Sequence, residues 1–340
     1  MKHRVAIVGA GVSGLTCGVL FAEHGYGTAT FAEETGQRTT SATAAAIWYP
    51  YDAEPADAVI AWAVETYNVL VDLNRKPRTG VSIIELRQFS RTGESQIPNW
   101  AVPLGGRALD ASAVTPGLYP VPDRAQRDSC SSVTPPAFKG GFAITVPLMD
   151  TTIYLNYLEE RLIKAGGSIT ANLHFERLDD VSREFDLVIN CSGIGARNLV
   201  HDVDLEPHRG QVAIVPKLDI SCAIVCDDPP LMYAIPRAND CVFGGTNELS
   251  ENLDVDPTVT SRIIAECSRV LNIDDPKVLA ARVGLRPFRK SGVCIRADRL
   301  SDGRTVIHNY GHGGAGFTLS WGCAENVFQI AARSTAALRR

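Results

Sequence analysis

The sequence predicts an α/β fold with about two domains. An apolar run at residues 5–8 leads into a glycine-rich turn, a helical stretch over 13–24 and a β-prone run over 28–31. A second strand rich in apolar residues, over 185–191, has the character of a central parallel strand and also ends in glycines. Between these segments, β-prone runs alternate with Pro, Gly and Ser clusters, which indicates an antiparallel part. With 340 residues, the chain is long enough for two cores.

The first turn carries the spacing G-x-G-x-x-G in its expected frame of strand, turn, helix and strand. Gly9 permits the tight turn, Gly11 lets a pyrophosphate approach the backbone, and Gly14 lets the helix pack against the strand. The N–H groups and the dipole at the start of the helix favour an anionic diphosphate. Glu33, nineteen residues after Gly14, can accept hydrogen bonds from ribose hydroxyls. The motif therefore predicts a dinucleotide site, but it does not distinguish FAD from NAD.

Composition excludes several other classes of function. The formal net charge of -5 gives no basic surface for nucleic acid, and no apolar run approaches the roughly 20 residues that span a bilayer. The nine cysteines are odd in number and scattered without a C-x-x-C pair, so we expect buried free thiols rather than disulfides or a metal site. Because the first strand begins close to the first residue, we also expect no signal peptide and a cytoplasmic location.

The remaining elements follow from periodicity and from turn residues. Helices are predicted over 55–73, 149–165 and 258–271, and from the tail glycines to about 338. Strands are predicted over 81–86, 168–170, 212–215, 221–225, 232–235, 241–244 and 305–308. The segment 77–142 is expected to be loop-rich with short strands.

Two further stretches have the residue types of a ligand-binding loop. In residues 37–51, small hydroxyl and alanine side chains allow close approach of a ligand, and the aromatic residues after them can wall a pocket. The alternative is an ordinary loop that leads into a helix. In residues 311–316, four glycines precede the final helix and form a second loop able to cradle an anion or a ring.

Taken together, the motifs resemble the D-amino-acid oxidase family of FAD flavoproteins, which includes D-aspartate oxidase. The resemblance extends almost from end to end. It is carried by VAIVGAGVSGL, TTSATAAAIWYPY, INCSGIGA, HRGQ, MYAIP, GLRPFR and HNYGHGGAGFTLSWG. Together, the last two motifs are quite specific to this family, whereas glycine and sarcosine oxidases share the N-terminal motif but not this tail.

The resemblance implies a Rossmann-like FAD-binding domain made of discontinuous segments, with an inserted substrate domain built on a mixed, mainly antiparallel sheet. We expect residues 1–50, 143–200 and 282–340 in the FAD-binding domain, and residues 51–142 and 201–281 in the substrate-binding domain. FAD is expected to be bound non-covalently. The other expected partners are a D-amino acid and O2, and the macromolecular partner considered is a second copy of the chain in a homodimer.

By the same resemblance, the cofactor contacts fall on the glycine turns, the acids after the second strand, the small residues that follow and the start of the last helix. The predicted FAD residues are Gly9, Gly11, Val12, Ser13, Gly14, Glu33, Glu34, Thr39, Thr40, Ser41, Ala45, Ala46, Ile47, Ser192, Gly313, Gly316, Phe317 and Thr318.

The resemblance also implies a substrate clamp. Arg286 in GLRPFR matches the arginine that binds the substrate carboxylate, and Tyr233 in MYAIP matches the tyrosine that assists it. The carbonyl of Gly314 is expected to accept from the substrate amino group, and Tyr49 and Tyr51 to shape the side-chain pocket. The alternatives are a surface salt bridge for Arg286, a core aromatic for Tyr233 and packing only for Tyr49.

Two nearby residues and three departures bear on the substrate. Arg237 is either a solvated loop charge or a residue at the pocket entrance, and His312 is expected to be structural rather than a base. Pro229 replaces a second tyrosine, and Ala315 stands where a tyrosine is common. Residues 226–228 contain no counterpart of the arginine with which D-aspartate oxidases hold the side-chain carboxylate. We therefore expect oxidative deamination of neutral or apolar D-amino acids. The alternatives are a D-aspartate or D-glutamate oxidase, a glycine- or sarcosine-type amine oxidase, and a flavin-binding sensor module without turnover.

Overall fold

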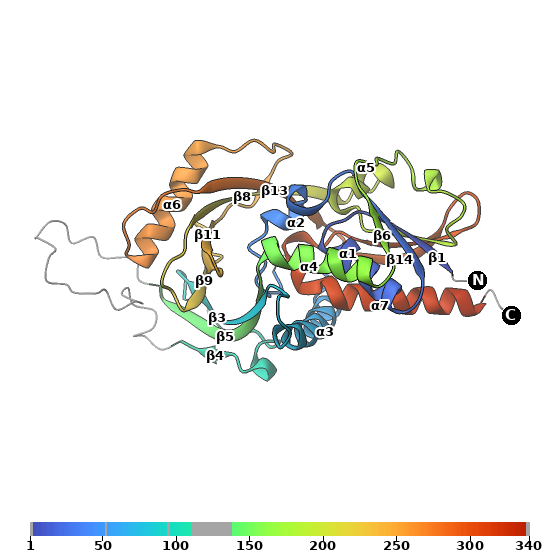
Figure 1. Ribbon diagram of the computed structural model, residues 1–340. Helices are drawn as coiled ribbons and strands as arrows, with labels where there is room; N and C mark the ends of the chain where they lie inside the picture. The colour runs from blue at the N-terminus through green and yellow to red at the C-terminus, as the bar shows by residue number, and fades with distance from the viewer. Residues whose placement is uncertain (1–2, 52, 94–95, 110–137, 338–340) are drawn as a thin grey trace, which may run out of the picture.

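The computed structural model describes residues 3–51, 53–93, 96–109 and 138–337. In this part of the chain, a six-stranded and a nine-stranded sheet stand at opposite ends of the molecule, with helices packed between and beneath them (Figure 1). Both ends of the chain lie at the six-stranded end (Figure 1). The α/β fold predicted from the sequence is confirmed.

The six-stranded sheet is parallel except for one edge strand. Its order is β14 (Cys294–Arg299), β15 (Thr305–Tyr310), β7 (Leu187–Asn190), β1 (Arg4–Val8), β2 (Gly27–Phe31) and β6 (Ser168–Thr170). Only β14 runs antiparallel to its neighbour, β15. On one side of β1 the sheet continues with β2 and β6. The later strands β7, β15 and β14 follow on the other side, so the strand order reverses between β1 and β7. In sheets of this type, ligands bind at such a reversal, beyond the carboxyl ends of the strands.

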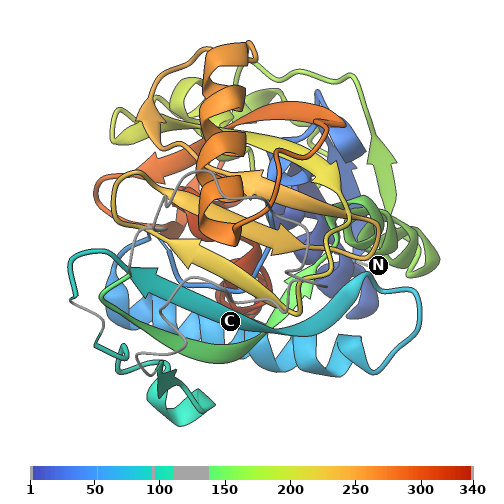
Figure 2. The same ribbon diagram turned by 90° about the vertical axis from the view of Figure 1, so that its left-hand side faces the viewer.

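The nine-stranded sheet is mixed and mainly antiparallel, as predicted. Its strands are β3 (Val81–Ser90), β4 (Arg107–Ala108), β5 (Gly140–Met149), β8 (Leu205–Pro216), β9 (Cys222–Cys226), β10 (Met232–Pro236), β11 (Asp240–Gly244), β12 (Glu248–Leu249) and β13 (Ala280–Arg289). Only the β3–β9 pair is parallel. Helix α6 (Pro257–Leu271) crosses this sheet on its outer side (Figure 2). Its apolar residues pack with those of β8 to β11 in one buried cluster.

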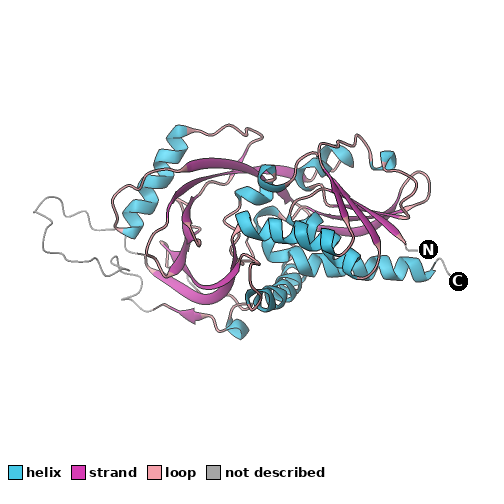
Figure 3. Cartoon of the chain, in the orientation of Figure 1, coloured by secondary structure: helices cyan, strands magenta, loops and turns pink. Residues whose placement is uncertain are grey.

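The other helices lie mainly against the six-stranded sheet and the junction of the two sheets (Figure 3). They are α1 (Val12–Glu23), α2 (Thr40–Thr43), α3 (Ala56–Asn74), α4 (Thr151–Lys164), α5 (Ala196–Leu199) and α7 (Gly316–Ala337). Helix α7 follows a short helix, η6 (Gly313–Ala315), and contacts both α1 and α3.

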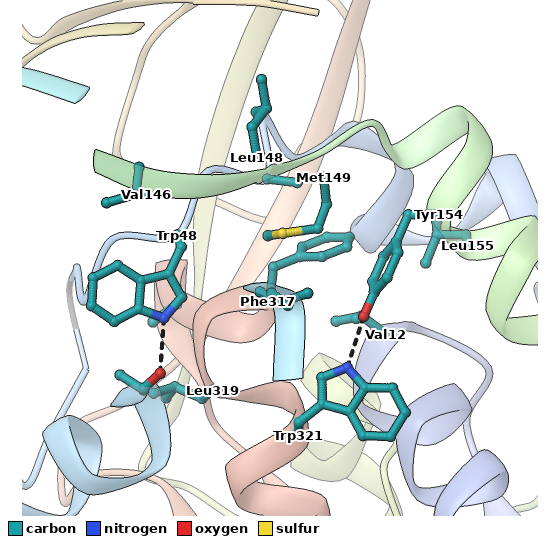
Figure 4. Packing of buried hydrophobic residues seen from close by; sticks show 14 of the residues in the cluster. Val12, Trp48, Val146, Leu148, Met149, Tyr154, Leu155, Phe317, Leu319 and Trp321 are labelled. Carbon is teal, nitrogen blue, oxygen red and sulfur yellow. Dashed lines mark hydrogen bonds between the residues drawn. The ribbon is translucent and has the colours of Figure 1, made fainter. Parts of the chain in front are cut away.

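Two buried indole hydrogen bonds fix helix α7 and the segment around Trp48, both of which contribute residues to the site described below (Figure 4). Trp321 Nε1 in α7 donates to the hydroxyl of Tyr154 in α4 at 2.8 Å. Trp48 Nε1 donates to the carbonyl of Ala63 in α3 at 2.9 Å. Because buried indole N–H groups are costly to leave unpaired, these bonds hold the start of α7 and the segment around Trp48 in defined positions.

Three of the longer strands, β5, β13 and β14, were not predicted from the sequence. β5 occupies the end of the segment expected to be loop-rich, and the helix predicted from 149 begins at Thr151, where the Asp150 side chain accepts from Thr152 N. β13 contains Gly284 and Pro287, which weaken a strand pattern. Among the described residues β8 is the ladder partner of β13, and the other side has a single isolated bridge, from Phe288 to His312, so Pro287 lies near a sheet edge where a missing N–H is tolerated.

The predicted domain boundaries do not coincide with the boundaries between the sheets. Residues 143–149 and 282–289, both assigned to the FAD-binding domain, pair within the nine-stranded sheet as parts of β5 and β13. Within the described ranges, no helix is both long and apolar enough to cross a membrane. Eight of the cysteines are buried free thiols, and the ninth, Cys130, lies outside the described residues.

Candidate active site

A cavity of about 960 Å³ runs along the carboxyl edge of the six-stranded sheet and extends to β8, β10 and β13. It lies where the strand order reverses, since β1 and β7 pair in parallel with Val8 opposite Asn190. Their following turns, which begin at Gly9 and Ser192, both line it. This volume is near the upper end of the range for small-molecule and cofactor sites.

The turn after β1 requires its glycines. Gly9 has a φ of +112°, and a Cβ there would overlap the carbonyl oxygen of Cys191. A Cβ on Gly14 would overlap the carbonyl oxygen of Gly9, so the helix can approach β1 only without a side chain there. Gly14 thus lies beneath the turn and does not line the cavity. All the other predicted site residues do line it, from Gly9 in the first turn to Thr318 in α7.

The start of α1 is tied to the small residues after β2. Val12 N donates to Ser41 Oγ at 2.9 Å, and a Cβ on Gly11 would come within 3.0 Å of that hydroxyl. Gly284 of β13 packs against α2, because a Cβ there would come within 3.2 Å of Thr43. The Ser41 hydroxyl and α2 therefore border the glycine turn where it lines the cavity.

The far end of the cavity, beyond β2, contains residues that were not selected from the sequence. Glu33 is exposed, and His174 Nδ1 lies 3.1 Å from Glu33 Oε2. Residues 173–176 line the cavity here because β6, which precedes them, pairs in parallel with β2. Leu173 N continues this alignment by donating to the carbonyl of Ala32 at 3.1 Å. No local motif in 173–176 indicates this position, since strand pairing alone creates it.

The glycine loop at residues 311–316 packs against two aromatic residues of the site, Tyr49 and Tyr51. A Cβ on Gly314 would come within 2.7 Å of the Tyr51 ring, so the loop and the ring are in close contact. The Thr318 hydroxyl accepts from Tyr49 N at 3.1 Å and lies 3.0 Å from the Tyr49 carbonyl. The Tyr49 and Tyr51 rings stack with centroids 6.2 Å apart. Both tyrosines line the cavity.

His312 is held as a neutral structural residue. Burial lowers its pKa to about 4, and its Nε2 lies 3.0 Å from Asn309 Oδ1. With this pKa the ring stays neutral near pH 7, and its Nε2–H is used in the hydrogen bond to the amide oxygen. This agrees with the structural role expected from the sequence.

The depressed pKa of His312 makes stability depend on pH. Below about pH 6.5 the unfolded chain protonates this histidine while the folded chain does not, so stability present above pH 6.5 is lost as the pH falls towards 4. We expect the free energy of unfolding to fall by about 1.4 kcal/mol per pH unit for this group. The measurement is denaturant unfolding between pH 7 and 5. His312→Gln should flatten the dependence, and replacement of the exposed His24 by glutamine should not; equal slopes in both variants contradict the assignment.

Arg286 on β13 and Tyr233 on β10 face the cavity from the nine-stranded sheet. Arg286 Nη1 donates to the carbonyl of Thr246 at 2.8 Å, and its guanidinium lies where a Cβ of Gly210 would be, at 2.5 Å. Among the described residues, no ion pair includes Arg286. The surface salt bridge considered from the sequence is therefore not present in this part of the chain.

Tyr233 is packed against backbone on one side and open to the cavity on the other. Its ring lies over Gly244 and Gly245, where a Cβ on either glycine would overlap it. Burial raises the pKa of Tyr233, and the nearby Arg286 guanidinium opposes this effect. The phenol therefore stays protonated at neutral pH and can donate a hydrogen bond to an anion.

Arg237 fits neither role considered for it. It is 5% exposed, pairs with both carboxylate oxygens of Asp240 at 2.6 and 2.8 Å, and donates to Thr151 Oγ1 at 3.2 Å. It does not line the cavity. Both predicted alternatives are wrong because the β10–β11 hairpin folds Arg237 inward, against its own acid and the start of α4.

Asp227 is a cavity residue that was not selected from the sequence. The Tyr49 hydroxyl donates to Asp227 Oδ2 at 3.0 Å. Burial raises the pKa of Asp227, the hydrogen bond from Tyr49 lowers it, and the charge of Asp228 raises it. The alternation of side chains along β9 could have identified Asp227, because it follows the cavity residue Val225 by two positions and so lies on the same face.

The chain matches the family model of FAD dependent oxidoreductases over residues 4–330. The chain belongs to this family. This FAD-dependent oxidoreductase is 36% identical to a D-amino-acid oxidase of Rubrobacter xylanophilus, over 96% of this chain and 95% of that protein. It is 35% identical to a D-amino-acid oxidase of Streptomyces coelicolor, over 96% of each chain. The resemblance inferred from the motifs is confirmed.

A solved structure shows the same fold at lower identity. Glycine oxidase from Geobacillus kaustophilus superposes on the oxidoreductase with a TM-score of 0.76 at 16% identity, covering 98% of this chain and 95% of that one. That degree of likeness supports the fold alone.

The cavity of this oxidoreductase fits FAD. Gly193, with a φ of +58°, has open space where its Cβ would be, as expected for backbone that a ligand approaches closely. Glutamates lie at one end of the cavity, glycine turns and helix starts lie along it, and alanines and aromatic rings lie further on. These are donor and packing groups for a ribose, a diphosphate and a flat ring system, in that order. FAD is the cofactor, and the individual contacts stay predictions.

Proposed function

We propose that this chain catalyses the oxidative deamination of D-amino acids. In the overall reaction, a D-amino acid, water and O2 give a 2-oxo acid, ammonia and hydrogen peroxide. The observation that carries the proposal is the Arg286 guanidinium, which faces the cavity without a carboxylate partner among the described residues, beside the Tyr233 hydroxyl. The two D-amino-acid oxidases at 35% and 36% identity support the same conclusion.

The chain's own residues supply binding and orientation. The guanidinium presents two parallel donors to the substrate carboxylate, and the Tyr233 hydroxyl donates a third hydrogen bond. The carbonyl of Gly314 accepts from the amino group. With the carboxylate and the amino group both fixed, only one enantiomer directs its Cα hydrogen towards the cofactor, and this explains selection for the D form.

The chemistry requires little proton transfer by side chains. FAD, when bound, supplies the acceptor for the two electrons that are removed when the Cα–N bond of the amino acid is oxidised. We propose O2 as the final electron acceptor. The amine needs to be neutral, and it can lose its proton to solvent before reaction. The stacked rings of Tyr49 and Tyr51 limit access of water to the clamped substrate.

The test is peroxide formation with matched D- and L-amino acids, glycine and sarcosine. We expect peroxide and 2-oxo acid in equal amounts with D-alanine or a longer D-amino acid, and none with the L forms. Turnover of glycine or sarcosine without D-alanine would favour the amine-oxidase alternative. If no D-amino acid bleaches the yellow flavin band under anaerobic conditions, the proposal is wrong and the sensor-module alternative gains support.

Several finer points belong to the same proposal. We propose that FAD is bound non-covalently, so acid precipitation of the protein should release all of the flavin into the supernatant. We also propose a cytoplasmic enzyme, with a homodimer as its form of assembly. We further propose a FAD-binding and a substrate-binding domain whose boundaries lie at the ends of β5 and β13 rather than at the residues expected from the sequence.

A further inference from the structure

We propose that Asp227 selects D-amino acids whose side chain ends in a cationic hydrogen-bond donor, such as D-lysine, and disfavours those whose side chain is anionic. This inference rests on the proposed function, because it takes the substrate to be held at its carboxylate by Arg286. Substrates with neutral or apolar side chains were expected from the sequence because residues 226–228 include no basic residue. The structure adds that one of these residues places a carboxylate in the cavity.

Strand pairing brings Asp227 close to the clamp. β9 and β10 pair with Val225 opposite Tyr233, and both residues line the cavity. Asp227 follows Val225 by two positions, which is about 7 Å along an extended chain. The backbone of Asp227 is thus about 7 Å along the strand from the residue opposite the clamp tyrosine, a spacing comparable with the length of the four-carbon side chain of lysine.

A continuous wall joins the carboxylate to the guanidinium. Asp227 accepts from Tyr49, whose ring stacks on Tyr51. The Tyr51 hydroxyl is 3.5 Å from Asn247 Nδ2, and Asn247 Oδ1 is 3.5 Å from Arg286 Nη1. The cavity therefore has an acceptor at one end of this wall and a cation at the other, separated by two aromatic rings. A D-amino acid with a carboxylate at one end and an ammonium at the other matches this polarity.

The carboxylate has capacity for such a partner. Among the described residues, Asp227 belongs to no ion pair, and the Tyr49 hydroxyl donates to its side chain. An ionised carboxylate accepts about four hydrogen bonds, and a partly buried one gains from each donor supplied. A substrate ammonium adds donors and balances the charge. A second carboxylate meets repulsion from Asp227.

The experiment compares D-lysine with D-norleucine, which has the same carbon chain without the ammonium. In the wild-type protein we expect a higher kcat/KM for D-lysine. In Asp227→Asn, which keeps the shape and removes the charge, the ratio of the two kcat/KM values should fall about 10- to 100-fold, the range for a hydrogen bond to a charged group. D-Norleucine should be oxidised about as well by the variant as by the wild type, and D-glutamate better.

Asp219→Asn is the matched control. Asp219 is exposed in the loop between β8 and β9, so the variant makes the same change of net charge away from the cavity and should leave the ratio unchanged. Turnover of D-alanine separates the two proposals. If the wild type oxidises no D-amino acid, the proposed function fails. If D-alanine and D-norleucine are oxidised but Asp227→Asn leaves the ratio of D-lysine to D-norleucine turnover unchanged, selection by Asp227 is overturned while the proposed function stands.

Discussion

Replacing Arg286 by alanine is expected to lower kcat/KM for D-amino acids on the order of 10³-fold while the protein keeps its FAD. Removing one partner of a desolvated, hydrogen-bonded charge pair costs several kcal/mol, because the other charge remains without its counterpart. The guanidinium lies over Gly210 on the nine-stranded sheet, away from the glycine turns proposed to hold the diphosphate. The measurement is steady-state peroxide formation, with flavin absorbance per chain recorded on the same samples.

Two further variants sharpen this prediction. Arg286→Lys keeps the positive charge but loses the two parallel donors, so we expect activity between those of the alanine variant and the wild type. Arg296→Ala removes an exposed arginine on β14 and should change neither activity nor flavin content. Normal turnover of D-amino acids by Arg286→Ala would show that this guanidinium does not bind the substrate carboxylate.

Replacing Gly14 by alanine is expected to remove most of the bound FAD and to lower the free energy of unfolding by about 3 kcal/mol. A Cβ at this position would overlap the carbonyl oxygen of Gly9, which is rigid backbone rather than the end of a flexible side chain. Helix α1 must therefore move away from β1, which displaces the N–H groups that we propose bind the diphosphate. Flavin absorbance per chain and denaturant unfolding measure the two effects.

Gly195→Ala provides the control for the Gly14 variant. Gly195 also lines the cavity, but its backbone is helical, with a φ of -60°, and a Cβ there would come no closer than 3.7 Å, to Ser192 Cβ. This is ordinary contact distance, so the variant should retain FAD and stability. Equal loss of flavin in both variants would mean that close packing at Gly14 is not the reason for its effect.

The sequence was most informative where a motif is local. The first strand, glycine turn and helix are specified by residues that are neighbours along the chain, and the structure places them within one residue of their predicted bounds. Arg286 and Tyr233 were selected through family motifs rather than local pattern. They come together because β8 and β11 pair in sequence between β13, which carries Arg286, and β10, which carries Tyr233.

The features that were missed depend on pairing at a distance. β13 contains glycine and proline and is held by its ladder with β8, so its own residues gave no strand signal. Residues 173–176 reach the cavity through the parallel pairing of β2 and β6. Asp227 was considered only for the positive charge that it lacks, and the pairing of β9 with β10 is what shows that its carboxylate belongs to the site.

β13 has a mechanical consequence. All ten of its residues pair with β8, Arg286 stands on it, and Gly284, two residues earlier, packs against α2 beside the cofactor turn. The same strand thus carries the guanidinium that we propose binds the reactant's acid group and borders the coenzyme loop. Because β13 forms a continuous ladder with β8 over its whole length, we expect the guanidinium and the segment beside the coenzyme loop to move together rather than independently.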